Sequence, residues 1–289
     1  MKTKHKKTAF TIVELLTVMS IIIILIGLLL PALNAVKRFS RVVLQKNQFR
    51  NIGSGLQVYE SDFHEYPDSS ALDADAAAYC GAMKLAEVMA GQDGLGFHLN
   101  SRLTINGRDA SGTGGTDLYP PVESPPYSAA YLESLRSRKE YMERKYIQIC
   151  SLLDLYGDKG SFSEPSVLLC DVFLSVRSKI TGSKIGVPVL YYRADTSKMS
   201  HDVNVPTNPD NIYNYKDNQD FLAIGWNSVT KEPPLYMGIS GVAGQVFYEN
   251  TLDKESPIPR PYNKDSYILI SAGWDGIYGT RDDVYNFTD

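Results

Sequence analysis

The first 36 residues combine a short basic segment with a long apolar run. Four lysines lie within residues 1–9, and after Glu14 no charged residue occurs before Lys37, which leaves residues 15–36 uncharged. A helix rises about 1.5 Å per residue, so this run of 22 residues is about 33 Å long and can cross the apolar core of a bilayer. Basic flanks stay on the cytoplasmic side. The pattern predicts a cytoplasmic leader at 1–9, one spanning segment at about 15–36 and a head outside the cytoplasm.

Apolar residues recur at helical spacing beyond this run. Five of them lie 3, 4, 3 and 4 positions apart, and therefore on one helix face: Phe49, Ile52, Leu56, Tyr59 and Phe63. This predicts one helix over 10–63, with a spanning half and an amphipathic half laid on a globular head at 64–289. Pro67 disfavours a helical Tyr66, so the helix should end a few residues earlier. Pro31 lacks a backbone donor and should kink or loosen the helix.

Common types of apolar N-terminal segment explain this one poorly. A cleaved signal peptide needs small residues at positions −3 and −1 after the apolar stretch, and Pro-Ala-Leu-Asn-Ala-Val at 31–36 fits that pattern badly. A plain signal anchor fits the hydropathy but gives no reason for Glu14. A charge at the edge of such a segment costs about 2.5 to 3.5 kcal/mol on insertion scales and tends to be functional.

Residues 9–16, Ala-Phe-Thr-Ile-Val-Glu-Leu-Leu, resemble the cleavage and methylation motif of type IV prepilins and type II secretion pseudopilins. In that family a short basic leader is cut just before a Phe, and a Glu lies four residues after it. The resemblance implies a cut between Ala9, where the family usually has Gly, and Phe10, which would become the N-methylated terminus. It also implies that Glu14 pairs with the terminal amine of a neighbouring subunit, because a buried charge needs a partner.

Two further segments support the resemblance. Helices of this family carry a proline about two-thirds through the apolar segment, which matches Pro31 and implies a role in assembly. Residues 51–67, ending in Tyr-Pro, resemble the end of the long helix in the major pseudopilin of type II secretion. The usual major pseudopilin has a much smaller head, so residues of about 70–220 resemble an insertion.

The resemblance implies a structural pseudopilin, not an enzyme, that assembles through its N-terminal helix into the filament of a type II secretion system. Its partners would be further copies of itself, a prepilin peptidase and the inner-membrane assembly platform. The protein would be a single-pass inner-membrane protein before it enters the filament, with its head in the periplasm or outside. Two alternatives remain: a type IV pilus pilin or minor pilin, and a membrane-anchored extracytoplasmic binding protein or enzyme.

The head itself has a mixed pattern. Residues 82–89, closed by Gly91, and residues 128–144 suit helices, whereas 166–176, 187–193 and 267–272 are rich in the residues that favour strands. Residues 106–127 predict a surface loop, and 213–225 are ambiguous. The expected fold class is α+β: a type IV pilin-like long helix packed on a head with an antiparallel sheet.

Composition and chemistry narrow the function classes. The net charge is −4, and without the four leader lysines it is −8, which disfavours nucleic-acid binding. Three cysteines match no metal spacing and allow at most one bridge, and four scattered histidines show no metal spacing either. The segment Gly238-Ile-Ser-Gly241 is not a nucleophile elbow, and Gly112–Gly115 lacks the flanking elements of a phosphate loop. No enzymatic site is expected.

The C-terminal segment 271–283 gathers three carboxylates among glycines. Glycines allow tight turns that point carbonyls inward, and hard oxygen ligands suit Ca²⁺. The segment resembles the calcium loop of the major pseudopilin, in which one Asp is followed seven and eight residues later by two more, here Asp275, Asp282 and Asp283. The resemblance implies a structural Ca²⁺ site, and the alternative is an acidic surface turn without metal.

Overall fold

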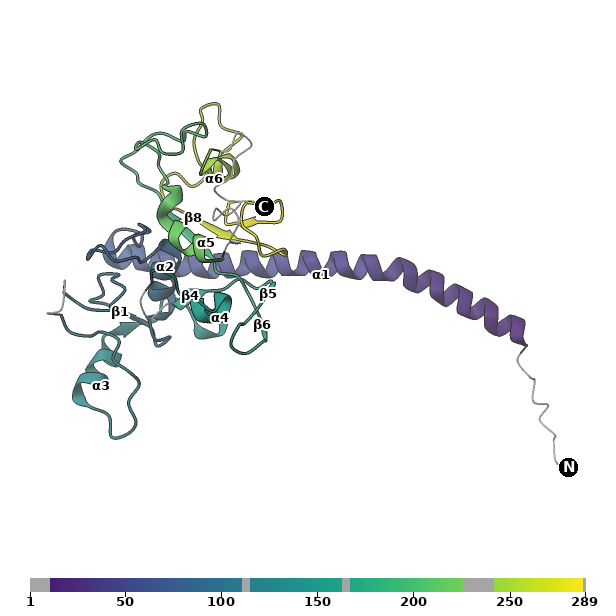
Figure 1. The fold of residues 1–289 in the computed structure, drawn as a ribbon, viewed down its shortest axis with the longest axis horizontal. Helices are drawn as coiled ribbons and strands as arrows, with labels where there is room; N and C mark the ends of the chain where they lie inside the picture. The colour runs from purple at the N-terminus through teal and green to yellow at the C-terminus, as the bar shows by residue number, and fades with distance from the viewer. Residues whose placement is uncertain (1–10, 111–114, 163–166, 226–241, 288–289) are drawn as a thin grey trace. The chain divides into compact units, whose positions relative to one another are not determined.

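The computed structural model describes residues 11–110, 115–162, 167–225 and 242–287 (Figure 1). The chain divides into two compact units, 1–43 and 44–289. Helix α1, Ile12–Phe63, contributes residues to both. The architecture is α+β, with one long apolar N-terminal helix and small antiparallel sheets, as the sequence predicts.

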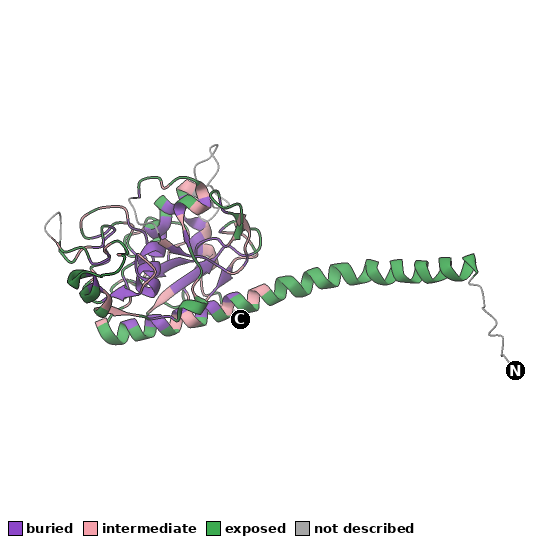
Figure 2. Cartoon of the chain, turned by 90° about the horizontal axis from the view of Figure 1, so that it is seen from below, coloured by how far each residue is buried: buried purple, intermediate pink, exposed green. Residues whose placement is uncertain are grey.

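In the first unit, α1 is an apolar helix without a protein core around it. Residues 12–40 are all exposed, as Figure 2 shows in green. An 18-residue stretch of α1 has a mean hydropathy of 2.8, so the helix is long and apolar enough to cross a membrane. The backbone is helical through Pro31. The loosening expected there is therefore not seen in the chain alone, and it remains a prediction for the assembled protein.

In the second unit, the predicted amphipathic face of α1 is confirmed. Phe49, Ile52, Leu56 and Tyr59 are buried, and Phe63 is half-buried with its ring stacked on Tyr59 at 4.5 Å between centroids. The helix ends at Phe63, before the Tyr-Pro pair, as the sequence predicts. This half of α1 is therefore one wall of the hydrophobic core.

Helix α2, Gly81–Ala90, runs through the middle of that core. All ten of its residues are buried, including Lys84 and Glu87. It packs against strands β4, Val167–Leu169, and β7, Leu190–Arg193. The chain leaves the helix at Gly91, whose φ of 77° is left-handed and whose N–H donates to the Glu87 carbonyl at 2.6 Å. The helix predicted at 82–89 is thus confirmed.

The largest sheet is antiparallel and has the order β7-β8-β9. Its strands are Leu190–Arg193, Tyr267–Ser271 and Val284–Tyr285. Ile270 of β8 lies opposite Leu190 of β7 on one side and Tyr285 of β9 on the other. The pairing of β7 with β8 joins two segments that are far apart in the sequence. Both strands are buried nearly throughout, so they lie in the same hydrophobic core.

Smaller elements complete the head. Three antiparallel strand pairs are β1 with β2, β3 with β4 and β5 with β6, at Phe97–His98, Arg138–Lys139, Ile149–Ser151, Val167–Leu169, Val176–Arg177 and Lys184–Ile185. The remaining described helices are α3 Ala129–Arg136, η1 Arg144–Tyr146, α4 Leu152–Tyr156, η2 Tyr215–Asn218, α5 Gln219–Gly225 and α6 Gln245–Thr251.

The helix expected over 128–144 is only half as long. Ser128 caps α3 by accepting the Tyr131 N–H at 3.1 Å, but the helix stops at Arg136. The next residues pair with β1, and Arg138 places one guanidinium nitrogen 2.5 Å from both carboxylate oxygens of Asp93. A partly buried ion pair and strand pairing therefore override the local helical preference.

The strand expected over 166–176 is interrupted. Ser166 lies outside the described residues, β4 ends at Leu169, and β5 begins only at Val176. The carboxylate of Asp171 accepts N–H bonds from Phe173 at 3.2 Å and Val187 at 3.1 Å, which turns the chain between the two strands.

Candidate functional site

The N-terminal turn of α1 holds Glu14 in a capping box. Thr11 donates its backbone N–H and its hydroxyl to Glu14 Oε2 at 2.9 and 2.7 Å, and its hydroxyl oxygen accepts the Glu14 N–H at 3.2 Å. Such reciprocal bonds satisfy donors that a helix start leaves free. Because the Thr-x-x-Glu spacing is visible in the sequence, the role of Glu14 in a capping box could have been predicted from the sequence. Ala9 and Phe10 lie outside the described residues.

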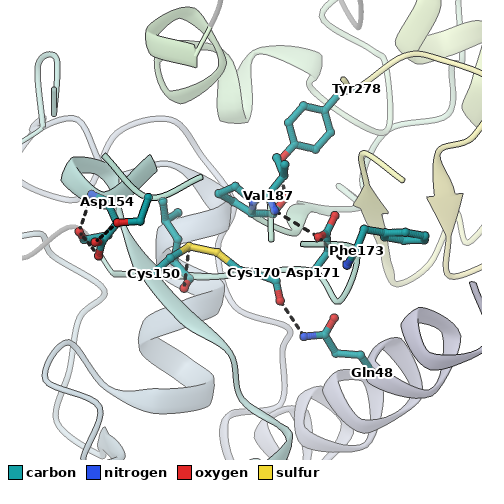
Figure 3. The surroundings of a disulfide bond; sticks show 12 residues. Gln48, Cys150, Asp154, Cys170, Asp171, Phe173, Val187 and Tyr278 are labelled. Atoms are coloured by element: carbon teal, nitrogen blue, oxygen red, sulfur yellow. Dashed lines mark hydrogen bonds between the residues drawn. A yellow bond between two sulfur atoms is a disulfide. The ribbon is translucent and has the colours of Figure 1, made fainter. Parts of the chain in front are cut away.

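The head contains one buried disulfide among its described cysteines, whose formation and pairing the sequence alone did not decide. Cys150, on β3, is bonded to Cys170, 20 residues later, while Cys80 is a free, buried thiol (Figure 3). The Gln48 side-chain amide donates to the Cys170 carbonyl at 2.8 Å. Three residues earlier on the same helix, Gln45 accepts the Val172 N–H at 3.0 Å. Two buried glutamines therefore fix α1 to the bridged segment.

Asp171 extends this connection to the main sheet. Besides the two backbone donors described above, its carboxylate accepts the Ser271 hydroxyl at 2.8 Å, at the end of β8. Figure 3 shows the hydrogen bond from the Val187 backbone to Asp171, the residue that follows Cys170 of the disulfide. The side chain is fully buried. A completely buried carboxylate costs free energy unless its oxygens are satisfied, so these bonds assign Asp171 a structural role.

Glycine geometry shapes the C-terminal aspartate loop. Gly273, Gly276 and Gly279 have φ values of 66°, 73° and 85°, a region that other residues rarely adopt. At Gly273 an added Cβ would lie 2.0 Å from the Asp282 carbonyl oxygen. The two ends of the loop therefore approach as closely as the backbone permits.

Asp275 and Asp282 meet within this loop. The Thr280 hydroxyl lies 3.0 Å from Asp275 Oδ2 and 2.7 Å from Asp282 Oδ1, so it bridges the two carboxylates. The other oxygen of Asp282 accepts the N–H groups of Trp274 and Asp275 at 2.6 and 2.9 Å. Burial acts to raise the pKa of Asp282, but the Thr280 hydroxyl and the two amides outweigh it and lower the pKa.

Asp283 points to different partners. Its Oδ2 accepts the Gly279 N–H at 2.8 Å and the Tyr285 hydroxyl at 3.0 Å, whereas its Oδ1 is buried without a hydrogen-bond partner. Burial raises the pKa of Asp283 to about 7, and the negative charge of Asp282 adds to this effect. The structure thus brings two of the three predicted ligands together through Thr280, and the third faces the aromatic edge of the sheet.

The donor set fits a calcium ion only in part. Within the described residues, no group of three or more acidic, histidine or cysteine side chains is arranged to hold a metal. The Leu269 carbonyl, two residues before the loop, accepts the Asn286 N–H at 3.3 Å. Asp275, the Oδ1 of Asp282 and nearby carbonyls would have to supply the ligands.

Buried charges elsewhere in the head have partners. Lys84 donates to Asp68 Oδ2 at 2.5 Å and to the carbonyls of Ser70 and Leu72, both at 2.9 Å. Glu87 accepts from Tyr119 at 3.0 Å and Gln92 at 3.0 Å, as well as from two further hydroxyls. These networks anchor α2 to the surrounding loops.

Comparison with known proteins adds no assignment: no family model, curated protein or solved structure matches this chain.

Proposed function

We propose that this protein is a structural pseudopilin, a subunit that assembles through its N-terminal helix into the filament of a type II secretion system. The observation that carries the proposal is the exposed helix of residues 12–40, which is uncharged over 15–36 and has one carboxylate, Glu14, in its first turn. An apolar surface of this extent is not stable in water. A bilayer covers it before assembly, and the helices of neighbouring copies cover it afterwards.

Glu14 supports the filament over a plain anchor. In the single chain its carboxylate binds the Thr11 backbone and hydroxyl through Oε2. In the filament the same carboxylate neutralises the methylated amine of Phe10 from a neighbouring copy. A charge enclosed by apolar helices is tolerated only with such a partner.

The disulfide supports a location of the head outside the cytoplasm. Bridges such as Cys150–Cys170 form and persist in oxidising environments and are rare in the cytoplasm. In this proposal the head lies in the periplasm or outside, and the chain is a single-pass protein of the inner membrane until assembly. The partners are other copies, a prepilin peptidase and the inner-membrane assembly platform, with no nucleic acid.

The proposal includes a structural Ca²⁺ site in the aspartate loop, with Asp275 and Asp282 as ligands. Asp283 joins them only if its side chain turns away from Tyr285. The bound ion would tie the C-terminal loop to the sheet, and so stabilise the folded head.

The test is mass spectrometry of the mature terminus in cells that carry a prepilin peptidase. We expect N-methyl-Phe10 for the natural chain and for Ala9→Gly, and an unprocessed chain for Ala9→Leu, which puts a bulky residue before the cut. An intact Met1 terminus in the natural chain would contradict the proposal and favour a membrane-anchored binding protein or enzyme. Electron microscopy of processed material separates a short pseudopilus from a long pilus made of pilins.

A further inference from the structure

The second half of α1 carries a polar stripe beside its buried face. The stripe consists of residues 4, 3, 4 and 3 positions apart, polar except for Gly53: Lys46, Arg50, Gly53, Gln57 and Glu60. All are exposed or half-buried. One end is basic and the other end is acidic, so the helix presents opposite charges at two levels along its length.

A groove lies along the basic end. Its volume is about 520 Å³, and it is formed by the α1 stripe and by Tyr267, Tyr285 and Phe287 at the edge of the main sheet. Lys46 and Arg50 are the charged residues among its described lining, which includes no carboxylate. Neither takes part in an ion pair with another described residue. The groove therefore combines two cations with an aromatic floor.

A second groove, of about 540 Å³, lies along the acidic end. Its lining is mostly acidic but also includes Arg193 and Lys198. Arg193 pairs with Glu65 at 2.9 Å and Lys264 pairs with Asp265 at 2.6 Å, whereas the exposed Glu60 has no ion pair with another described residue. Tyr66 lines this groove and Tyr267 lines the basic one, and their rings are in contact, with centroids 5.1 Å apart. The two grooves are thus neighbours on one side of the head, separated by an aromatic pair.

We propose that the basic groove of one copy receives the acidic end of a second copy, with Lys46 and Arg50 facing the partner copy's Glu60. This inference rests on the proposed function and names the surfaces that join the heads. The contact joins two different patches, and a heterologous contact that does not close on itself produces an open helical filament.

Charge complementarity favours a second copy as the occupant. Residues 64–289 contain 20 Lys and Arg against 30 Asp and Glu, a net charge of −10. Residues 37–50 contain five basic residues and no acidic one. Heads this acidic repel one another unless a basic surface lies between them. The spacing within the stripe also sets the axial offset between neighbouring copies. Glu60 lies 10 residues beyond Arg50 and 14 beyond Lys46, which corresponds to an offset of about 15 to 21 Å along the helix.

The first test reverses charges in the full-length protein, expressed with a prepilin peptidase. We expect Arg50→Glu and Glu60→Arg each to lower the yield of sheared filaments about tenfold, because like charges then face each other. The double variant restores the pair and should recover most of the yield. Arg136→Glu is the matched control: its side chain is 76% exposed on α3, away from the stripe, and its yield should stay near that of the natural chain.

The second test is cysteine cross-linking in assembled filaments, which does not depend on loss of function. Positions 50 and 60 are about 15 Å apart on one helix, too far for a bridge within a copy. Arg50→Cys with Glu60→Cys should therefore give a ladder of covalent oligomers on oxidation, and Arg136→Cys with Glu60→Cys should give none. The free thiol among the described native cysteines, Cys80, is buried.

The outcomes separate the two proposals. If the natural chain forms filaments but the 50–60 pair gives no ladder and charge reversal has no effect, the stripe contact is wrong and the pseudopilin proposal stands. Loss of yield without recovery in the double variant and without a ladder also overturns the contact. If the natural chain is neither processed nor assembled, both proposals fall.

Discussion

The side-chain amide of Gln48 donates a 2.8 Å hydrogen bond to the carbonyl oxygen of Cys170, the residue that closes the disulfide with Cys150. The contact is buried, and it ties the long helix to a segment more than a hundred residues away in the sequence. The segment closed by the disulfide thus holds the second half of α1 in place. A loss of the disulfide should therefore weaken the attachment of the helix to the head.

Reduction of the disulfide should lower the free energy of unfolding by about 3 kcal/mol, because the bridge closes a loop of about 20 residues. Chemical denaturation of the detergent-solubilised chain measures this. The double variant Cys150→Ala with Cys170→Ala should match the reduced natural protein, and reductant should change it no further. Equal stability with and without reductant would contradict the bridge.

Glu14→Gln should abolish filament assembly while it leaves membrane insertion and cleavage intact, since it keeps the size of the side chain but removes the charge. Glu14→Ala should be at least as defective. Thr11→Val is the matched control: it removes a partner of the capping box, at a cost of about 1 kcal/mol to the helix start, and keeps the carboxylate. If Thr11→Val abolishes assembly to the same extent as Glu14→Gln, the role of Glu14 is that of a helix cap and not of a charge partner.

Calcium should raise the melting temperature of the full-length protein, and a chelator should reverse the effect. At a hundredfold excess over the dissociation constant the gain is about 3 kcal/mol. Asp282→Ala also loses two backbone hydrogen bonds, so the informative quantity is the difference with and without Ca²⁺, which should vanish. Asp275→Asn should reduce the same difference, while the exposed Glu133→Ala should leave it unchanged. A melting temperature that chelator does not move would reject the site.

Asp217 should make the head more stable in mild acid. Burial raises the pKa of this carboxyl to about 7 in the folded state, and the nearby charge of Asp68 adds to the effect. The folded chain then binds a proton that the unfolded chain, with an ordinary pKa of about 4, releases. This contribution to stability is complete below about pH 4 and is lost as the pH rises to about 7.

Asp217→Asn isolates that contribution. Its amide oxygen can still accept the Ser69 hydroxyl, which lies 2.5 Å from Asp217 Oδ2. The variant should gain stability relative to the natural chain as the pH rises from 4 to 7. Denaturant titrations at several pH values measure the difference, and parallel curves for the two proteins would show that Asp217 is ionised in the folded state.

Pro31→Ala should restore a backbone donor and stiffen α1. If assembly requires the helix to loosen at this point, the variant should insert and be processed normally but form fewer filaments. Filament structures of both proteins give the direct measurement. The same unbroken helix at residue 31 in both would refute the loosening.

The sequence predicted the elements whose periodicity is local. The buried face at Phe49, Ile52 and Leu56 and the short helix before Gly91 follow from spacing alone. The helix expected to reach Arg144 stops at Arg136, because Arg138 binds Asp93, 45 residues earlier. Interactions at that separation leave no local pattern.

Of the candidate site, too, the sequence predicts the local features and not those that depend on distant contacts. The loop glycines and the contact between Asp275 and Asp282 fit the sequence pattern, since Thr280 and the tight turns lie within the loop itself. The turn of Asp283 away from Asp275 and Asp282 depends on its bond with Tyr285 and on its burial, which the spacing of the residues does not encode. The pairing of Cys150 with Cys170 likewise depends on how β3 and β4 align.

Helix α2 bears on how this head can be engineered. On the proposed function, residues of about 70–220 would be an insertion relative to the smaller head expected of a major pseudopilin, and their removal would be the obvious route to a minimal filament subunit. Yet all ten residues of α2 are buried within that region, and β7, the main-sheet strand paired with β8, also belongs to it. Excision would remove the centre of the core and leave the aromatic face of α1 without a covering layer. Shortening of this protein should therefore begin at its exposed periphery, for example at α3, where most side chains face solvent.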